Sequence, residues 1–228
     1  YYIKNQRIIK ELNCQKQENN IGGRAMKKIG ILGGTFNPIH HGHLILGQAA
    51  KEEFGLDEIL VMPTKNPAYK MISGGVSEQN RVDMIKLAIA NFPYFKFSDM
   101  ELKRDGTTYT VDTLRALTQK DDDCRYYFIM GADSLYQIET WKDPDQIFHM
   151  ANILVATRND SRSALDAQID YLEEKYSGKI YHLSSPSIEI SSNDIRKRCK
   201  NGSSIHFFLP EDVIDYIERN DLYGITAD

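Results

Sequence analysis

The chain has 228 residues, of which 41% are hydrophobic and 26% are charged, values that are ordinary for a globular protein. This length suffices for one α/β domain with a filled core. The formal net charge of −4 argues against nucleic acid as a partner, because a long polyanion selects a basic surface, and the lack of 18 consecutive apolar residues argues against a membrane span.

Residues 1–25 are polar, end in Gly22-Gly23 and lack the apolar stretch of a signal peptide. We expect them to form an extension, disordered or partly helical, ahead of a single domain at residues 26–228. Three scattered cysteines, Cys14, Cys124 and Cys199, form no C-x-x-C pair, which favours a reducing compartment over a disulfide framework. The sequence therefore predicts a cytoplasmic protein, and it leaves the formation of homo-oligomers open.

From Lys27 onward, apolar runs typical of buried strands alternate with helical patterns. We expect strands, in chain order, at Lys28–Leu32, Glu58–Met62, Phe95–Leu102, Tyr126–Met130, Asn152–Thr157 and Lys179–Leu183. Between and after them we expect helices at His43–Phe54, after the cap residue Ser77, at Val111–Gln119 with Thr110 as its cap, and at Ala164–Tyr176, Ser192–Lys200 and Glu211–Asn220. This order predicts an α/β fold: a mostly parallel sheet with helices on both faces and a small C-terminal helical part. Ligands of such sheets bind at the carboxyl ends of the strands.

A glycine-rich turn and a histidine cluster follow the first expected strand. Gly33, Gly34, Thr35 and Phe36 lead into the segment His40-His41-Gly42-His43. Glycines let backbone N–H groups approach phosphate oxygens, and a helix N-terminus attracts anions. His40 and His43 are three residues apart, so their rings share one helix face. The pattern indicates a nucleotide-phosphate site that is neither a P-loop nor a dinucleotide fingerprint.

Two simpler interpretations of the histidines compete with this one. They could be metal ligands, but zinc requires three or four ligands, and no cysteine or carboxylate lies nearby at ligand spacing. We therefore expect no metal site built from protein side chains. They could also be ordinary helix-face residues, which is a poor explanation for three histidines beside a Gly-Gly turn.

A second anion-binding segment opens the penultimate helix. Ser191 and Ser192 are preferred N-cap residues, so capping alone could explain them. A cap does not require Arg196, which adds a cation one turn into the helix. We therefore predict that two helix N-termini, distant in sequence, converge on one polyphosphate.

The two segments resemble the paired signatures of the H-x-G-H nucleotidyltransferase superfamily. With Trp141 after the Gly-Ala-Asp strand end, they resemble more narrowly the bacterial nicotinate mononucleotide adenylyltransferases, over about Met26 to Tyr223. The resemblance implies a Rossmann-like nucleotidyltransferase domain that transfers the adenylyl group of ATP to nicotinate mononucleotide. The products would be deamido-NAD and pyrophosphate, in NAD biosynthesis, with Mg²⁺ accompanying ATP.

The resemblance also implies residue roles. Charge on the reacting phosphates would be stabilised by the catalytic residues His40, His43 and Arg196. ATP would be bound by Gly33, Gly34, Thr35, Phe36, Lys70, Arg158, Ser191 and Ser192. Nicotinate mononucleotide would be bound by Tyr109, Thr110, Asp133 and Trp141, with Trp141 stacking on the pyridine ring. Without the flanking motif, Trp141 would be interpreted first as a core or surface anchor, and Asp133 could be a helix cap.

Three alternatives remain at this point. A sister adenylyltransferase would accept nicotinamide mononucleotide or pantetheine phosphate instead. A nucleotide-binding module without catalysis would bind ATP without turnover. A metal-dependent hydrolase would use the histidines as ligands and would keep its activity after Arg196→Ala.

Overall fold

The computed structural model describes residues 26–68, 76–121, 123–156, 162–186 and 188–224. The predictions for residues 1–25, for Lys70 and for Arg158 lie outside these ranges. Among the residues so described, no helix is both long and apolar enough to cross a membrane.

Six parallel strands form one sheet, which confirms the predicted parallel sheet. The strands are β1 (Lys27–Gly34), β2 (Glu58–Pro63), β3 (Phe95–Phe97), β4 (Cys124–Gly131), β5 (Ala151–Ala156) and β6 (Ile180–Leu183). Their order across the sheet is β3-β2-β1-β4-β5-β6, with Leu32 of β1 opposite Val61 of β2 and Ile129 of β4. The chain progresses outward in both directions from β1 and β4. A crevice therefore opens between these strands at their carboxyl ends, where ligands bind in such sheets.

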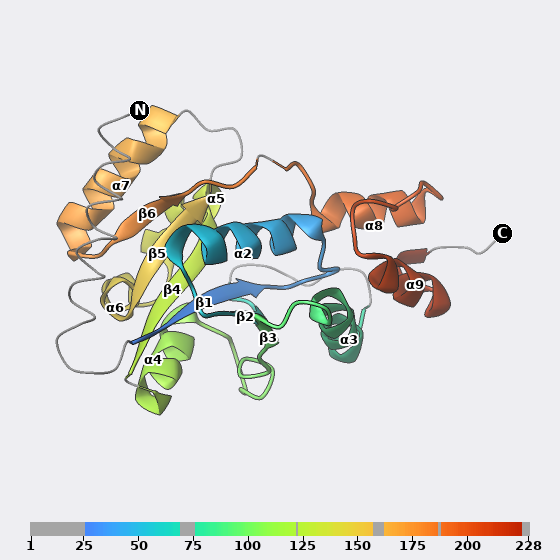
Figure 1. Ribbon diagram of the computed structural model, residues 1–228, viewed down its shortest axis with the longest axis horizontal. Helices are drawn as coiled ribbons and strands as arrows, with labels where there is room; N and C mark the ends of the chain where they lie inside the picture. The colour runs from blue at the N-terminus through green and yellow to red at the C-terminus, as the bar shows by residue number, and fades with distance from the viewer. Residues whose placement is uncertain (1–25, 69–75, 122, 157–161, 187, 225–228) are drawn as a thin grey trace.

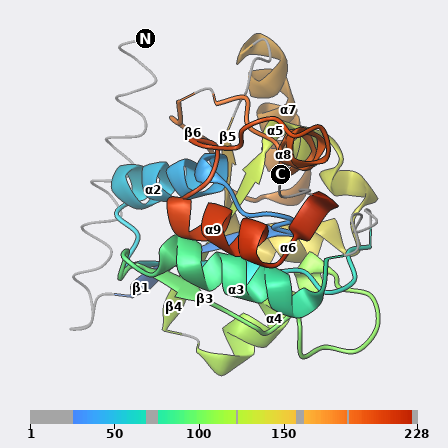
Figure 2. The ribbon, with the colours of Figure 1, turned by 90° about the vertical axis from the view of Figure 1, so that its right-hand side faces the viewer.

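Helices cover both faces of the sheet (Figure 1). One face carries α2 (His41–Phe54) and α3 (Glu78–Ile89), together with α8 (Ser192–Lys200) and α9 (Glu211–Arg219). The other carries α4 (Thr110–Lys120), α5 (Ala132–Tyr136), α6 (Pro144–Met150) and α7 (Arg162–Tyr176). Helices α8 and α9 lie beyond the carboxyl end of β1, and α9 runs alongside α3 (Figure 2). The predicted C-terminal helical part is thus placed next to the strand ends.

Alternation along the strands divides the core into two layers. On β4, Tyr127 and Ile129 face the layer under α2, whereas Tyr126 and Met130 face the layer under α4 and α6. A strand buried on both sides reads as a continuous apolar run, which is why β1, β4 and β5 could be located from sequence.

Two element predictions need correction, and two short helices were not predicted. The strand predicted at Phe95–Leu102 ends at Phe97, because the chain turns away from the sheet edge through Met100 to Lys103. Thr110 is not the cap of its helix: Tyr109 has the extended N-cap backbone, and Thr110 is the first helical residue. Helices α5 and α6 were not predicted, since five and seven residues are too few to show a helical period.

Close approach of α2 to the sheet edge depends on Gly47. A methyl group there would lie 2.6 Å from Cε1 of the Phe95 ring, well inside van der Waals contact. We expect Gly47→Ala to destabilise the fold by up to about 2 kcal/mol, because a helix-propensity gain of about 1 kcal/mol only partly offsets an overpacking cost of about 1–3 kcal/mol. Urea unfolding measures this. An unchanged or higher midpoint would show that the Phe95 ring moves aside without cost.

Candidate active site

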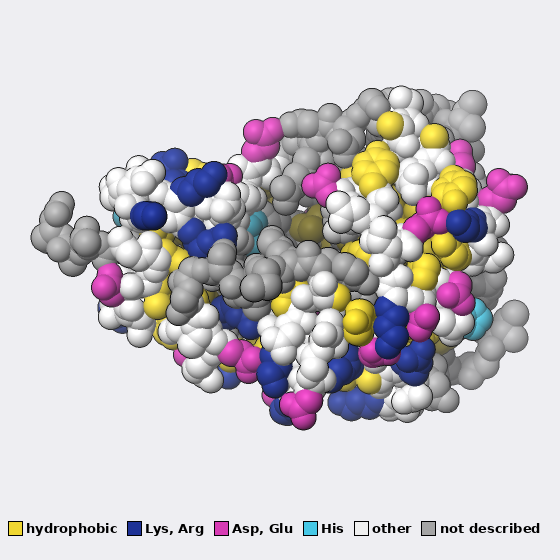
Figure 3. All heavy atoms as spheres, turned by 180° about the vertical axis from the view of Figure 1, so that it is seen from behind, with side chains coloured by type: hydrophobic (Ala, Val, Ile, Leu, Met, Phe, Trp, Pro, Cys, Tyr) yellow, Lys and Arg dark blue, Asp and Glu magenta, His cyan; other side chains and the backbone are white. Residues whose placement is uncertain are grey.

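A cavity of about 660 Å³ opens at the carboxyl ends of β1 and β2, facing the start of α8. The predicted site residues on its wall are Gly33, Gly34, Thr35, His40, His43, Thr110, Trp141, Ser191, Ser192 and Arg196. Seen from behind, the molecule is hollowed near its middle, with a histidine on the wall and hydrophobic side chains deeper inside (Figure 3). The two predicted anion-binding segments therefore share one cavity.

His40 and His43 contact each other at the start of α2. His40 is the N-cap residue, with an extended backbone at φ −149° and ψ 169°, and its backbone N–H donates to Nδ1 of His43 over 3.2 Å. An accepting Nδ1 carries no proton, so the neutral His43 ring holds its proton on Nε2. The ring centroids are 3.7 Å apart, and two imidazolium ions at that separation would repel each other. The geometry favours a neutral His43 that donates through Nε2.

Phe36 lies under this pair and not on the cavity wall. Its side chain is buried, and its ring meets the His43 ring edge-on, with centroids 4.9 Å apart. Its backbone is left-handed, at φ 45°, a conformation that non-glycine residues rarely adopt outside functional turns. Phe36 thus supports the orientation of His43, a different role from the direct ATP contact predicted for it.

The start of α8 is bonded directly to the turn before the histidines. Ser192 Oγ donates to the carbonyl oxygen of Pro38 over 2.9 Å, and Arg196 Nη1 donates to that of Asn37 over 2.7 Å. Ser191 caps the helix, because its hydroxyl accepts from the backbone N–H of Asp194. These contacts hold the guanidinium of Arg196 and the imidazole of His43 at one cavity.

A buried arginine braces the loops after β1 and β2. The Arg81 side chain, from α3, donates to the carbonyl oxygens of Thr35 over 2.8 Å and Thr64 over 2.9 Å. The residue is only 2% exposed, and burial lowers the pKa of its guanidinium. Sequence reasoning missed Arg81, since an arginine in an amphipathic helix normally faces solvent.

Another part of the cavity wall is aromatic and is formed by Trp141 and Phe128. Trp141 is half-buried and meets Phe128 edge-on, with ring centroids 6.1 Å apart. Its chain neighbour Lys142 forms an ion pair with Asp112 of α4 over 3.1 Å, and it lies over the Tyr109 ring. These contacts tie the segment that carries Trp141 to α4.

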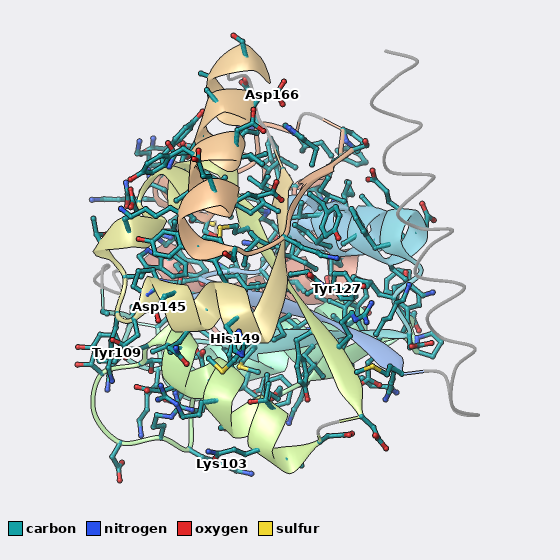
Figure 4. The ribbon with its side chains drawn as sticks, turned by 90° about the vertical axis from the view of Figure 1, so that its left-hand side faces the viewer. Lys103, Tyr109, Tyr127, Asp145, His149 and Asp166 are labelled. Carbon is teal, nitrogen blue, oxygen red and sulfur yellow. The ribbon has the colours of Figure 1, made fainter. Side chains whose placement is uncertain are left out.

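Two residues predicted for the acceptor nucleotide lie elsewhere. Tyr109 packs against the core layer under α4 and beneath Lys142, at the margin of the molecule in Figure 4. Asp133 is exposed in the first turn of α5. Neither residue is among the described residues that line the cavity.

A buried carboxylate, also missed from sequence, lines the cavity. Glu101 is 7% exposed and accepts from the Thr113 hydroxyl over 2.8 Å, and that hydroxyl accepts in turn from Arg104. Burial raises the pKa of the Glu101 carboxyl. Sequence reasoning had placed Glu101 inside the strand predicted at Phe95–Leu102, where a charged residue normally faces solvent.

The raised pKa of Glu101 predicts a pH-dependent effect of Glu101→Gln. As the pH rises from about 4 toward the raised pKa, the unfolded chain loses this proton more readily than the folded protein, so the stability of the wild type falls. The amide carries no such proton and still offers an oxygen to Thr113. We expect the free energy of unfolding of the variant, minus that of the wild type, to increase from about pH 4 to about pH 7. Urea unfolding at both pH values tests this, and a constant or decreasing difference would contradict it.

A second, smaller hollow of about 90 Å³ adjoins the first on the other side of the histidines. It lies at the ends of β4 and β5, and its walls are formed by His40, Gly42, His43, Leu46, Gly131, Ala156, Ser185, Pro186, Ile188 and Ile190. His40 and His43 belong to both hollows. A ligand that spans the two would therefore have its middle at the imidazoles.

Comparison with known proteins places the chain in a family. A sequence model described as cytidylyltransferase-like matches residues 31–198. A Lachnoclostridium phytofermentans protein named "Probable nicotinate-nucleotide adenylyltransferase" is 48% identical over 199 residues, covering 87% of this chain and 100% of that protein. The chain belongs to the nicotinate-nucleotide adenylyltransferase family. A Clostridium botulinum member with the same name is 41% identical, over 87% of this chain and 98% of its own.

Solved structures agree on the fold. The nicotinic acid mononucleotide adenylyltransferase of Plasmodium falciparum, complexed with NaAD, matches with a TM-score of 0.70 at 21% identity. The match covers 89% of this chain and 100% of that one. At this identity the likeness establishes the Rossmann-like architecture alone. Family membership rests on the nicotinate-nucleotide adenylyltransferases of higher identity, and it confirms the resemblance found from the sequence.

Proposed function

We propose that this chain transfers the adenylyl group of ATP to nicotinate mononucleotide, forming deamido-NAD and pyrophosphate. The observation that carries the proposal is the position of His40 and His43 between two hollows. The product is a dinucleotide, with adenosine at one end, a pyridine nucleoside at the other and phosphates between. Such a molecule matches a site that has a hollow on each side and phosphate-binding groups at its centre.

The reaction needs no protein nucleophile. The phosphate of nicotinate mononucleotide attacks the α-phosphorus of ATP, one P–O bond forms, and the bond to the β-phosphate breaks to release pyrophosphate. Catalysis of such a step consists mostly of in-line positioning and stabilisation of charge. His43 would donate from Nε2 to a phosphate oxygen, and Arg196 would neutralise charge from the α8 side. Gly33 and Gly34 line the cavity, so their backbone is within reach of a phosphate bound there.

The two hollows divide the substrates. The smaller hollow, with walls that include Leu46, Pro186 and Ile190, suits the flat, weakly polar adenine. The aromatic part of the larger cavity wall, where Trp141 and Phe128 meet, suits the pyridine ring. We assign adenosine to the first and the acceptor to the second, with Thr110 beside the acceptor.

Mg²⁺ is the proposed metal, bound together with ATP. This ion is held in nucleotide enzymes mainly by substrate phosphates and water, with one or two protein carboxylates. No group of three or more potential ligands occurs among the described residues, which fits an ion that enters with the nucleotide better than one held in a protein cage. Bound there, Mg²⁺ would neutralise phosphate charge. We also propose a cytoplasmic location, supported by the free, buried thiols of Cys124 and Cys199.

Release of pyrophosphate with three acceptors tests the proposal. The purified protein is given ATP, Mg²⁺ and, separately, nicotinate mononucleotide, nicotinamide mononucleotide or pantetheine phosphate. We expect the largest kcat/KM with nicotinate mononucleotide. Equal or better use of another acceptor would assign the chain to a sister reaction, and ATP binding without turnover would remove the enzyme assignment.

A further inference from the structure

A tyrosine from the end of the described chain contacts the phosphate-binding turn. Tyr223 lies in η2 (Leu222–Gly224), the short segment after α9, and its hydroxyl donates to Oδ1 of Asn37 over 2.8 Å. Asn37 is 3% exposed and lines the larger cavity between the glycine turn and His40. The last described turn of the chain thus reaches a residue of the cavity wall.

The backbone around Tyr223 is held in an unfavourable conformation. Tyr223 has φ 67° and ψ 15°, and Asp221 has φ 46°, so two non-glycine residues in this segment are left-handed. Such residues cost free energy and persist where surrounding contacts impose them, commonly at functional sites. Here the segment packs against both α8 and α9. Burial also raises the pKa of the Tyr223 phenol, which keeps the hydroxyl protonated and able to donate.

Three side chains of the C-terminal part donate hydrogen bonds to Asn37 and Pro38 of the turn before His40. Arg196 donates to the carbonyl oxygen of Asn37, Ser192 to that of Pro38, and Tyr223 to the side chain of Asn37. Arg196 and Ser192 also line the cavity, so they can contact the phosphates themselves. Tyr223 is not among the described residues on the cavity wall, and it reaches that wall through its hydrogen bond to Asn37.

We propose that Tyr223 is a positioning residue for adenylyl transfer, whose hydroxyl fixes Asn37 and thereby the turn that presents the phosphate donors. The inference rests on the proposed function. Donors that are held in place before the reaction contribute mainly in the transition state, so a looser turn lowers kcat more than it weakens substrate binding. Tyr223 would then add a positioning role to the direct phosphate contacts that Arg196 and Ser192 of the C-terminal part can make.

Tyr223→Phe, compared with Tyr216→Phe, separates positioning from stability. Tyr216 lies in α9, and its hydroxyl bonds Asp83 over 3.0 Å and Asn80 over 3.1 Å, both on α3. Both variants lose partly buried hydrogen bonds of the same C-terminal part, but of the two tyrosines it is Tyr223 that bonds to the turn. We expect Tyr223→Phe to lower kcat about 3- to 10-fold with little change in either KM, the size expected for one hydrogen bond. Tyr216→Phe should keep kcat within about twofold of the wild type, even though it loses two bonds.

A double-mutant cycle with Asn37→Ala tests the route through Asn37. Asn37→Ala removes the same hydrogen bond from its other side and leaves η2 intact. We expect Tyr223→Phe to have no further effect on kcat in the Asn37→Ala background, because coupled residues are not additive. If Tyr223→Phe alone folds poorly, Asn37→Ala is measured by itself: it should lower kcat, and an unchanged kcat would overturn the positioning role.

The outcomes are distinct. Full kcat in Tyr223→Phe, equal losses in Tyr223→Phe and Tyr216→Phe, or additive effects in the cycle would each overturn the positioning role. Wild-type turnover is measured first in the same assay. A wild type that releases no pyrophosphate would refute the proposed function itself, which distinguishes that failure from a failure of the role of Tyr223.

Discussion

His43→Ala is expected to lower kcat by about 10²–10³-fold, the usual cost of removing one preorganised donor from a developing charge. The His43 ring is held between His40 and Phe36, and its Nδ1 accepts from the His40 backbone N–H, so Nε2 is its donor. Alanine removes that donor without adding bulk. Steady-state release of pyrophosphate gives kcat, and thermal unfolding of the same samples gives stability.

His41→Ala is the matched control. His41 is the adjacent histidine of the same segment, but its Nδ1–H donates to the carbonyl oxygen of Phe207 over 3.0 Å, and it is not among the described residues lining either hollow. We expect it to retain most of its kcat. If His43→Ala keeps its activity and instead loses a large part of its thermal stability, the histidine pair is a structural cap of α2.

Trp141→Ala is expected to raise the KM for nicotinate mononucleotide by about 10- to 100-fold, because stacking of a flat heterocycle on an aromatic side chain contributes about 1–3 kcal/mol. The KM for ATP should change little, since Trp141 lines the larger cavity but is not among the described residues of the smaller hollow. Trp141→Phe keeps an aromatic face and should recover most of the affinity. Initial rates with each substrate varied in turn separate the two KM values.

An equal rise in both KM values would contradict the stacking role. It would show that Trp141 maintains the shape of the whole site through Phe128 and the core layer under α4. Lys142→Ala tests whether the position of Trp141, and not only its presence, matters for acceptor binding. It keeps the indole but removes the ion pair with Asp112, and any effect should again fall on the acceptor KM alone.

The sheet and the two phosphate-binding segments could be predicted because their signals are local. Strands β1 and β4 contain the apolar runs Ile29–Leu32 and Tyr126–Met130, and a parallel sheet brings its carboxyl ends to one edge. The glycine turn, the histidines and the Ser-Ser-Arg helix start each carry their chemistry within a few residues. Family resemblance then supplied Trp141, which the structure also places on the cavity wall.

The remaining parts of the site depend on contacts that no local pattern records. Arg81 is an ordinary helix residue until α3 folds against the loops after β1 and β2. The contact of Tyr223 with Asn37 joins residues 186 apart in the chain. For Tyr109 and Asp133, a motif match located both residues in the sequence, but neither is among the described residues that line the cavity.

The central claim is that the starts of α2 and α8 bind one triphosphate, with the acceptor on Trp141. A crystal structure with nicotinate mononucleotide and a non-hydrolysable ATP analogue tests it most directly. We predict phosphate oxygens within hydrogen-bond distance of both His43 Nε2 and the Arg196 guanidinium, adenine in the smaller hollow and the pyridine ring against Trp141. Phosphates that contact only one of the two helix starts, or that bind outside the larger cavity, would contradict it.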